Sequence, residues 1–380
     1  MFVASKINFW YHLVNILNIL NKLLNEVIPF MNDLLINAKD MKKVILQSIR
    51  TLLIELGSST KVELSQKLGI SFPTISKFLS QMEDDGEVIL AGMDDSNGGR
   101  RAKRYRYNPE FMLGLAIFLE KNETNYTVFN CLGELKDQGK IASLLMEDAS
   151  DVTKHIEEII EKHPKISSIA IGVPASVKDG QIIYIPNYEQ FHHFDLKGYF
   201  EERFSIPVVV ENDMNAAVLG YSNNNKIEHN PSLVYLYLGQ NGPGAGIIVN
   251  GDVIRGNSFF SGEIAFVPQY DDRNFGDSLK RRTELDKTNL QQEQEIDAIS
   301  RMVVTFTAML NPRTIIFHSD EVDESMLNQI TNRSATYIPT EHLPELTLSN
   351  WMQDYLYGLQ SLALDLMVSG TSIHMDGEHE

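Results

Sequence analysis

Apolar residues recur with two different spacings along the chain, and the spacing changes near Phe111. In "MKKVILQSIRTLLIELG", from Met41 to Gly57, apolar residues return every three to four positions, which predicts an amphipathic helix ending at the glycine. From Phe111 onward, β-rich runs such as "MLGLAIFLE", "ISSIAIGVPA" and "IPVVVENDMNAAVLGY" alternate with helical patterns such as "DASDVTKHIEEIIEKHP". The pattern predicts a helical module followed by a larger α/β region.

The α/β region contains two successive series of strands and helices. The second series starts at "SLVYLYLGQNGPGAGIIVNGDVIRG" and continues through the helical pattern "IDAISRMVVTFTAMLNP" to the strand "RTIIFHS". Two such series predict two α/β lobes with a ligand cleft between them. We therefore expect an apolar helical extension at 1–40, a small domain at 41–108, and two lobes at 109–230 and 231–380.

The extension at 1–40 is apolar without being a membrane span. Asparagines and a lysine interrupt it well short of the ~18 apolar residues that a membrane helix needs, and no Ala-x-Ala cleavage signal follows. The apolar residues between Leu13 and Val27 fall on one helical face, which can pack on a neighbouring element or a partner chain. The alternative is that translation starts at Met31 or Met41.

Two short helices joined by a tight turn are predicted in "STKVELSQKLGISFPTISKFLSQMEDDGEVI". Thr60 and Glu63 have the spacing of a capping box, and Gly69 supplies the turn. Ser71 can cap the second helix, with Pro73 in its first turn. This arrangement is typical of a helix-turn-helix.

The N-terminal end of the second helix is the expected reader of DNA bases, because this end contacts base edges when such a helix enters the major groove. The apolar residues of this helix fall on the opposite face. The expected base-contacting residues are Phe72, Pro73, Thr74, Ser76 and Lys77.

A basic hairpin follows. After Gly86 the run "EVILAGMDDSNGGRRAKRYRYN" has strand-like residues around a Gly-Gly turn, which predicts a wing. Because the whole chain carries a net charge of −18, a local reversal of charge indicates a site for phosphate. The expected phosphate contacts are Arg100, Arg101, Lys103, Arg104 and Arg106. The alternatives are that the winged module docks a protein and that the basic run is solvated surface.

Cysteine use limits the chemistry further. Cys131 is the one cysteine, so the chain has neither an intramolecular disulfide nor a multi-cysteine zinc site. A reducing, cytoplasmic compartment fits this composition, and we expect no metal.

Four runs, "IAIGVPASVKDGQIIYIPN", "VVVENDMNAAVLG", "YLYLGQNGPGAGIIVNGDVIRGNSFFSGEI" and "MLNPRTIIF", resemble in order and spacing the ROK family of sugar kinases and sugar-responsive repressors. The resemblance covers about residues 45–370. It implies an N-terminal winged helix-turn-helix followed by a two-lobed, actin-like and sugar-kinase-like α/β domain.

The resemblance also implies a sugar site. Kinases of the family use an aspartate to take the proton of the attacking sugar hydroxyl, and it matches Asp213 in "ENDMN". With Asn187, Asn212 and Glu263 this gives carboxylates and amides, which suit sugar hydroxyls. Each has a structural alternative: Asn187 in a turn, Asn212 and Asp213 as helix caps, Glu263 in an ion pair.

The nucleotide motifs depart from the family pattern. Ala116 stands where an aspartate is expected, and Leu119, Glu120 and Lys121 stand near an expected Gly-Gly-Thr. His318, Ser319 and Asp320 replace the glycines that let the nucleotide lie close, and Gly239, Gly242, Gly244 and Gly246 are what remains of the nucleotide elements. A glycine-rich loop alone also occurs in tight turns, so we expect neither ATP turnover nor a nucleotide cofactor.

The motif after the glycine loop departs as well. Ala265 and Phe266 follow Glu263 where the family has Gly-His, and no cysteine cluster comes after them. The expected consequence is that no structural zinc forms there. Phe266 either stacks on a sugar face or plugs the pocket.

The sequence thus predicts a ROK-type repressor that binds operator DNA as a homodimer or higher homo-oligomer, with a sugar or sugar phosphate as effector and no membrane partner. Two alternatives stay open. One is a weak sugar kinase with an attached DNA-binding domain. The other is a ligand-independent docking protein.

Overall fold

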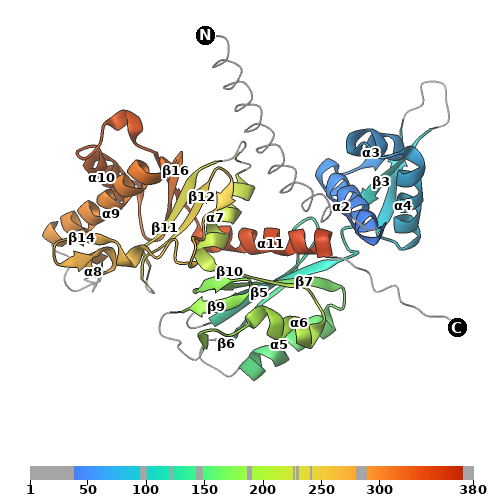
Figure 1. Ribbon diagram of the computed structural model, residues 1–380, viewed down its shortest axis with the longest axis horizontal. Coiled ribbons are helices and arrows are strands. Elements are labelled where there is room, and N and C mark those ends of the chain that lie inside the picture. The colour runs from blue at the N-terminus through green and yellow to red at the C-terminus, as the bar shows by residue number, and fades with distance from the viewer. Residues whose placement is uncertain are drawn as a thin grey trace, which may run out of the picture. The chain divides into compact units, whose positions relative to one another are not determined.

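The computed structural model describes residues 38–94, 101–119, 123–142, 149–185, 191–225, 227, 231–239, 242–279 and 289–370. These residues divide into two compact units, one ending at Tyr107 and the other beginning at Asn108 (Figure 1). The extension predicted at 1–40 lies outside the described residues, apart from Ala38–Asp40 at the start of helix α2.

The first unit combines three helices with a three-stranded antiparallel sheet in the order β1-β3-β2. Its helices are α2 (Ala38–Leu56), α3 (Lys61–Leu68) and α4 (Phe72–Asp84). Its strands are β1 (Ser59–Thr60), β2 (Val88–Met93) and β3 (Lys103–Tyr107). The apolar side of each helix is buried, with Leu53, Leu64 and Leu79 almost fully so. This burial orients the three helices around one small core.

Local interactions explain where these helices begin. Thr60 and Glu63 form both hydrogen bonds of a capping box at α3, and Gly69 ends that helix with a φ of 65°. The Ser71 side chain accepts from the Thr74 backbone N–H at the start of α4. Beneath them, the buried guanidinium of Arg50 on α2 pairs with Glu87, whose carboxylate also accepts from the Tyr107 hydroxyl at 3.2 Å. This pair fastens α2 to the base of the β2–β3 hairpin.

The first lobe of the second unit is built on a five-stranded sheet in the order β10-β7-β4-β5-β6. Strands β4, β5 and β6 are antiparallel, whereas β7 and β10 run parallel to β4. The strands are β4 (Leu113–Leu119), β5 (Glu123–Asn130), β6 (Leu135–Ala142), β7 (Ile166–Val173) and β10 (Val208–Asn212). Helices α5 (Ala149–Lys162) and α6 (Leu196–Phe204) cover one face, and the small hairpin is β8 (Ser176–Lys178) with β9 (Gln181–Tyr184).

The second lobe repeats this strand order as β13-β12-β11-β16-β17. Again three strands are antiparallel and two run parallel to the first of them. The strands are β11 (Leu233–Tyr237), β12 (Gly244–Val249), β13 (Asp252–Val253), β16 (Thr314–His318) and β17 (Glu345–Ser349). The other elements are α8 (Phe275–Leu279), α9 (Asn289–Leu310), α10 (Glu324–Ser334), β14 (Pro268–Tyr270), β15 (Arg273–Asn274) and the 3₁₀ turns η2 (Ile264–Phe266) and η3 (Thr340–His342). The two α/β series expected from the sequence are therefore present.

Helices α7 (Asp213–Asn224) and α11 (Trp351–Gly370) cross between the two sheets (Figure 1). A Cβ at Gly220 would lie 1.8 Å from the carbonyl oxygen of Asp354, and a Cβ at Gly358 would lie 1.8 Å from that of Ala216. The crossing therefore requires glycine on both helices. Helix α11 packs on β4, β7 and β10 of the first lobe, although it lies in the span predicted for the second lobe.

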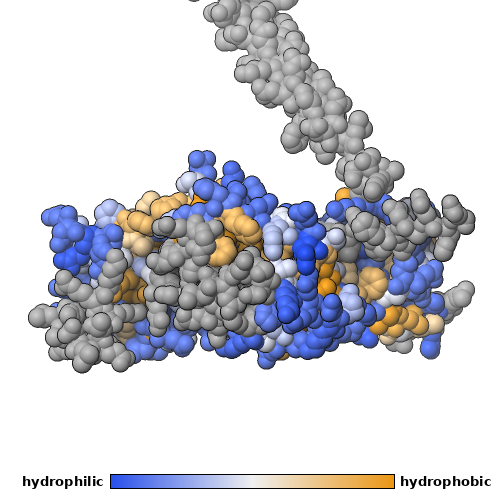
Figure 2. Space-filling model, turned by 90° about the horizontal axis from the view of Figure 1, so that it is seen from below, coloured by the Kyte–Doolittle hydropathy of each residue, from blue (hydrophilic) through white to orange (hydrophobic). Residues whose placement is uncertain are grey.

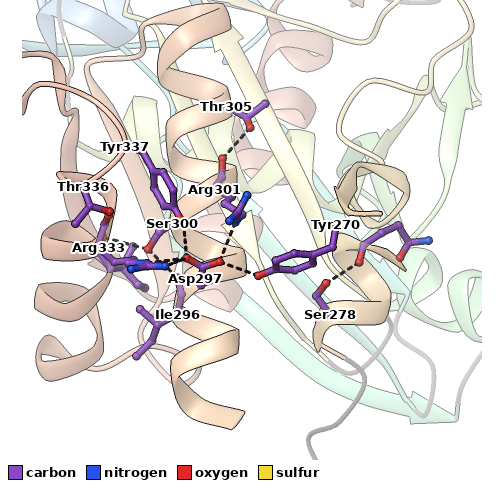
Figure 3. Close-up of polar contacts among 12 residues, drawn as sticks. Tyr270, Ser278, Ile296, Asp297, Ser300, Arg301, Thr305, Arg333, Thr336 and Tyr337 are labelled. Carbon is purple, nitrogen blue, oxygen red and sulfur yellow. Dashed lines mark hydrogen bonds and ion pairs between the residues drawn. The ribbon is translucent and has the colours of Figure 1, made fainter. Parts of the chain in front are cut away.

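A dense polar network around Asp297 on α9 fastens the outer part of the second lobe (Figure 3). The carboxylate accepts from Tyr270 at 2.8 Å, Arg301 at 2.8 Å and Arg333 at 2.6 Å, and also from the Tyr337 hydroxyl. The Arg301 guanidinium lies 5.0 Å from the Tyr270 ring centroid and 5.2 Å from that of Tyr337. This network joins α9, α10 and β14.

The face shown in Figure 2 is mainly hydrophilic, with separate apolar patches among polar side chains. Isolated patches of this kind are ordinary on folded proteins. Among the helices that the structure describes, none is long and apolar enough to cross a membrane.

Candidate functional site

The predicted sugar contacts begin where strand β10 ends and helix α7 starts. The Asn212 side chain caps α7 by accepting from the backbone N–H groups of Met214 at 2.9 Å and Asn215 at 3.0 Å. Its amide donates to the carbonyl of Ala175 at 3.1 Å. The capping role considered for Asn212 is thus present, and it fixes the direction of the first turn of α7.

Asp213, the next residue, is half-buried in that first turn, where it accepts from the Met214 N–H at 2.8 Å. Burial raises the pKa of its carboxyl to about 7, and the nearby Glu263 carboxylate pushes that pKa in the same direction. No cation of the described residues forms an ion pair with it. Asp213 is therefore poised between its protonated and ionised forms near neutral pH.

Glu263 brings the second lobe to the same place. It precedes the 3₁₀ turn η2, and its carboxylate accepts from the Ser176 hydroxyl of β8 at 3.3 Å. Burial raises the pKa of Glu263, while the Ser176 hydrogen bond acts in the opposite direction. Asp213, Glu263 and Ser176 thus converge from both lobes. Asn187, the remaining predicted sugar contact, lies outside the described residues.

A second link between the lobes was not predicted. Glu211, the residue before Asn212, is 5% exposed and pairs with Arg255 from the segment after β13. The Glu211 carboxylate also accepts from the Asn215 amide and the Asn212 backbone N–H, both at 3.0 Å. The pair therefore connects the segment that leads to Glu263 with the start of α7. The sequence gives no local signal for it, because its partners are 44 residues apart.

The glycines retained before and within β12 have structural reasons of their own. A Cβ at Gly246 would lie 2.0 Å from the Met214 carbonyl oxygen, and one at Gly239 would meet the Tyr237 ring at 2.2 Å. Gly242 has a φ of 103°, which side-chain-bearing residues rarely adopt. These glycines permit the close approach of β12 to α7 and a tight turn. Their presence is therefore not by itself an indication of phosphate binding.

Two of the positions that depart from the family's nucleotide motifs lie in packed surroundings. Ala116 is buried in the middle of β4, opposite Thr127 and Ala170, and Leu119 is buried at the end of that strand. Glu120 and Lys121 lie outside the described residues.

Aromatic rings gather at the end of β16. The Tyr237 and Trp351 rings stack with centroids 4.8 Å apart, and the His318 ring stacks on Tyr237 at 6.1 Å. His318 Nδ1 accepts from the backbone N–H of Trp351 at 3.2 Å. This cluster ties the ends of β11 and β16 to the first residue of α11.

In the first unit, some of the predicted base-contacting side chains are exposed, and others are hydrogen-bonded within the unit. Phe72, Pro73 and Lys77 are exposed at the N-terminal end of α4. The Thr74 hydroxyl is hydrogen-bonded to Ser71 at 2.8 Å, and the Ser76 hydroxyl accepts from Lys61 at 3.0 Å. Thr74 and Ser76 therefore already have partners within the unit.

The cations of the β2–β3 hairpin are also not equivalent. Arg101, Lys103 and Arg106 are exposed, with Lys103 3.7 Å from Glu83. Arg104 instead donates to Asp94 at 2.8 Å, to Glu63 at 3.2 Å and to the Ser58 carbonyl at 3.2 Å. These bonds raise the pKa of Arg104, and Glu63, held chiefly by the Thr60 N–H, has a lowered pKa. Arg104 thus braces the hairpin against α3, whereas Arg100 lies outside the described residues.

Residues 123–275 match the ROK family. The xylose repressor of Caldicellulosiruptor bescii is 26% identical over 215 residues, which are 54% of this chain and 53% of the repressor. The beta-glucoside kinase of Listeria innocua is 28% identical over 130 residues, which are 34% of this chain and 44% of the kinase. The chain spans about half the length of these curated relatives.

The fold agrees with these matches. The crystal structure of a ROK family transcriptional regulator, homologous to the E. coli MLC protein, aligns with a TM-score of 0.65 at 16% identity. The alignment covers 86% of this chain and 98% of that one. The α/β unit therefore has the sugar-kinase-like fold of these proteins, and its residues 123–275 match the ROK family.

Proposed function

We propose that the chain is a sugar-responsive transcriptional repressor. It binds operator DNA through a winged helix-turn-helix in the first unit and a sugar or sugar derivative at Asp213 and Glu263, without kinase activity. The observation that carries the proposal is the pair of half-buried carboxylates, one from each lobe, with no cation among their described partners. The similarity to proteins named xylose repressor makes xylose the first sugar to test.

The DNA-binding part of the proposal rests on the first unit. Helices α3 and α4 meet through the capped turn around Gly69, and the N-terminal end of α4 presents Phe72, Pro73 and Lys77 to solvent. The exposed cations Arg101, Lys103 and Arg106 lie on or beside the adjacent hairpin. In a chain with a net charge of −18, such a group is suited to DNA phosphates, while α4 enters the major groove.

The sugar-binding part rests on hydrogen-bond capacity. A carboxyl group with a pKa near neutral can accept from a sugar hydroxyl when ionised and donate to one when protonated. The Asp213 and Glu263 carboxyls are held by Met214 and Ser176, so their positions are fixed before a ligand arrives. A ligand that bridges them changes DNA binding only if it prefers one arrangement of the lobes.

The direct test is capture of genomic DNA fragments by the purified chain at several salt concentrations, with and without xylose. We expect one or a few inverted-repeat sites, because two-fold operators match a dimeric repressor, and release by the sugar. Lys77→Ala should relax the preference for these sites. The Arg101→Ala/Arg106→Ala double variant should weaken binding to all DNA and flatten the salt dependence.

Arg104→Ala is the matched control. Its guanidinium is engaged within the unit, so its loss should lower the melting temperature more than it changes the salt dependence. Capture of no DNA, or unaltered binding by the Arg101→Ala/Arg106→Ala variant, would reject the winged helix-turn-helix assignment.

A second candidate is a sugar kinase, because Asp213 is retained and a beta-glucoside kinase is among the relatives. Buried Ala116 and the aromatic cluster of Tyr237, His318 and Trp351 argue against it. If the chain hydrolyses ATP only when a sugar is present, and Asp213→Asn abolishes that hydrolysis, the proposal that it lacks kinase activity is wrong. A sugar panel read by thermal shift addresses the ligand-independent docking protein, since a bound ligand raises the melting temperature.

A further inference from the structure

Two exposed phenylalanines lie three residues before and three residues after Glu263. Phe260 is 44% exposed and Phe266 is 53% exposed. Their ring centroids lie 5.4 Å apart with the planes tilted by 43°. The two rings thus form one continuous apolar surface that the described residues leave half uncovered.

Backbone hydrogen bonds fix this surface relative to Glu263. The Glu263 N–H donates to the Phe260 carbonyl at 3.3 Å, and the Phe266 N–H donates to the Glu263 carbonyl at 3.3 Å. The turn is anchored in turn to β12, because the Ala245 N–H donates to the Gly262 carbonyl at 2.9 Å. The backbone that carries both rings is therefore held in place relative to the backbone of Glu263.

Two other residues of the same segment, Glu263 and Phe259, contact strand β8 of the first lobe. Ser176 of β8 donates to Glu263, and the Lys178 ammonium lies 5.9 Å from the centroid of the Phe259 ring. Glu263 and Phe259 are therefore engaged with β8, while Phe260 and Phe266 stay open to solvent. Since Phe260 and Phe266 lie on the same hydrogen-bonded turn as Glu263, they are the exposed aromatic side chains nearest in sequence to a ligand at that carboxyl.

Carbohydrates match this combination of groups. A sugar ring presents hydroxyls around its edge and C–H groups on its faces, so it needs hydrogen-bonding side chains in one place and a flat apolar surface in another. We propose that Phe260 and Phe266 form an aromatic subsite for a second sugar ring, so that the preferred ligand is a saccharide of at least two linked rings. This inference rests on the proposed sugar site and specifies its ligand.

Calorimetric titration of the full chain with monosaccharides and their β-linked disaccharides, xylose and xylobiose first, tests the subsite. The disaccharide should bind about tenfold more tightly than its monosaccharide, because stacking on aromatic rings adds to the contacts of the first ring. Phe260→Ala and Phe266→Ala should each remove most of that difference and change monosaccharide binding less than about twofold. Phe266→Trp should retain it.

The matched control is Leu132→Ala, which removes a side chain that is 51% exposed in the first lobe and should change neither affinity. Equal losses for both ligands in the phenylalanine variants, or no preference for the disaccharide in the unaltered chain, would overturn the subsite while leaving the sugar site intact. If no saccharide binds at all, the sugar site fails together with the subsite. Asp213→Ala distinguishes failure of the subsite from failure of the sugar site, because it should weaken the binding of monosaccharide and disaccharide alike.

Discussion

Two aspartates of the α/β unit show how differently the fold treats a carboxylate that it withdraws from water. Asp297 accepts hydrogen bonds from two tyrosines and two arginines (Figure 3). Burial alone would raise its pKa, but the hydrogen bonds from Tyr337, Arg301, Tyr270 and Arg333 together hold that pKa well below the usual range.

Asp213 has the opposite surroundings. Burial raises its pKa to about 7, and the Glu263 carboxylate adds to this, although hydrogen bonds from the Met214 backbone and the Asn212 side chain act in the opposite direction. The Asp297 carboxylate has its hydrogen-bond donors within the protein. The Asp213 carboxylate has fewer donors, and a ligand can supply more. A satisfied network stabilises the fold, whereas an incomplete one indicates a binding site.

The largest effect is expected from breaking the complete network. Asp297→Ala leaves Arg301 and Arg333 without their shared partner, and the unfolding free energy should fall by about 2–4 kcal/mol, since both guanidinium groups are partly exposed. Thermal melting measures the loss. Asp297→Asn keeps the size of the side chain, so its unfolding free energy should lie between that of the unaltered chain and that of Asp297→Ala. A loss below about 0.5 kcal/mol would mean that the network contributes little.

A substitution at Asp213 should change ligand affinity. Asp213→Ala should weaken the best-binding saccharide by about 10- to 100-fold, because a hydrogen bond to a charged group contributes about 1.5–3 kcal/mol. Without ligand, the melting temperature at neutral pH should not fall, because the buried carboxylate is unfavourable when ionised. Asp297→Asn is the control, because it should lower stability and leave saccharide affinity unaltered. Unchanged affinity in Asp213→Ala would remove Asp213 from the site.

The two aspartates should also differ in pH dependence. The folded-state pKa of Asp213 is raised from 3.8 to about 7, so the folded chain binds more protons than the unfolded chain between these values. Its contribution therefore makes the protein less stable as pH rises from about 4 to about 7. Asp213→Asn should flatten the melting temperature across this window. For Asp297, whose pKa is lowered, stability is lost only as pH falls below the unfolded value of 3.8.

A smaller effect is expected at Glu211, which resembles Asp297 because Arg255 pairs with it. Arg255→Gln would leave this carboxylate with its amide and backbone donors alone. We expect a loss of about 1 kcal/mol in stability, because Arg255 is partly exposed, and a severalfold loss of saccharide affinity as the start of α7 loosens. Arg255→Lys should restore part of both. Affinity equal to that of the unaltered chain would show that the pair does not position the site.

The sequence predicted what short spacings determine. The capping box of Thr60 and Glu63, the cap at Ser71 and the two α/β series were all readable, because helix caps and strand periodicity depend on residues close together in the chain. Asp213 and Glu263 came from the family resemblance.

Long-range partners were not readable. Ser176 meets Glu263 across 87 residues, and Tyr337 meets Asp297 across 40. The basic run shows the same limit, because five cations look alike in the sequence although Arg104 is engaged by Glu63, 41 residues earlier. Which cation forms ion pairs within the protein depends on long-range contacts, and no local sequence pattern contains them.

The crossing of α7 and α11 at Gly220 and Gly358 has a consequence for how this chain can diverge. Backbone touches backbone there, so even one methyl group on either helix forces the helices apart. Moving them apart would displace Asp213 at the start of α7 as well as the sheet beneath α11. A saturation mutagenesis library selected for folding should therefore be nearly empty at these two codons and well populated at exposed Phe260 and Phe266. New ligand specificities can then arise on the rim of the site while the crossing stays fixed.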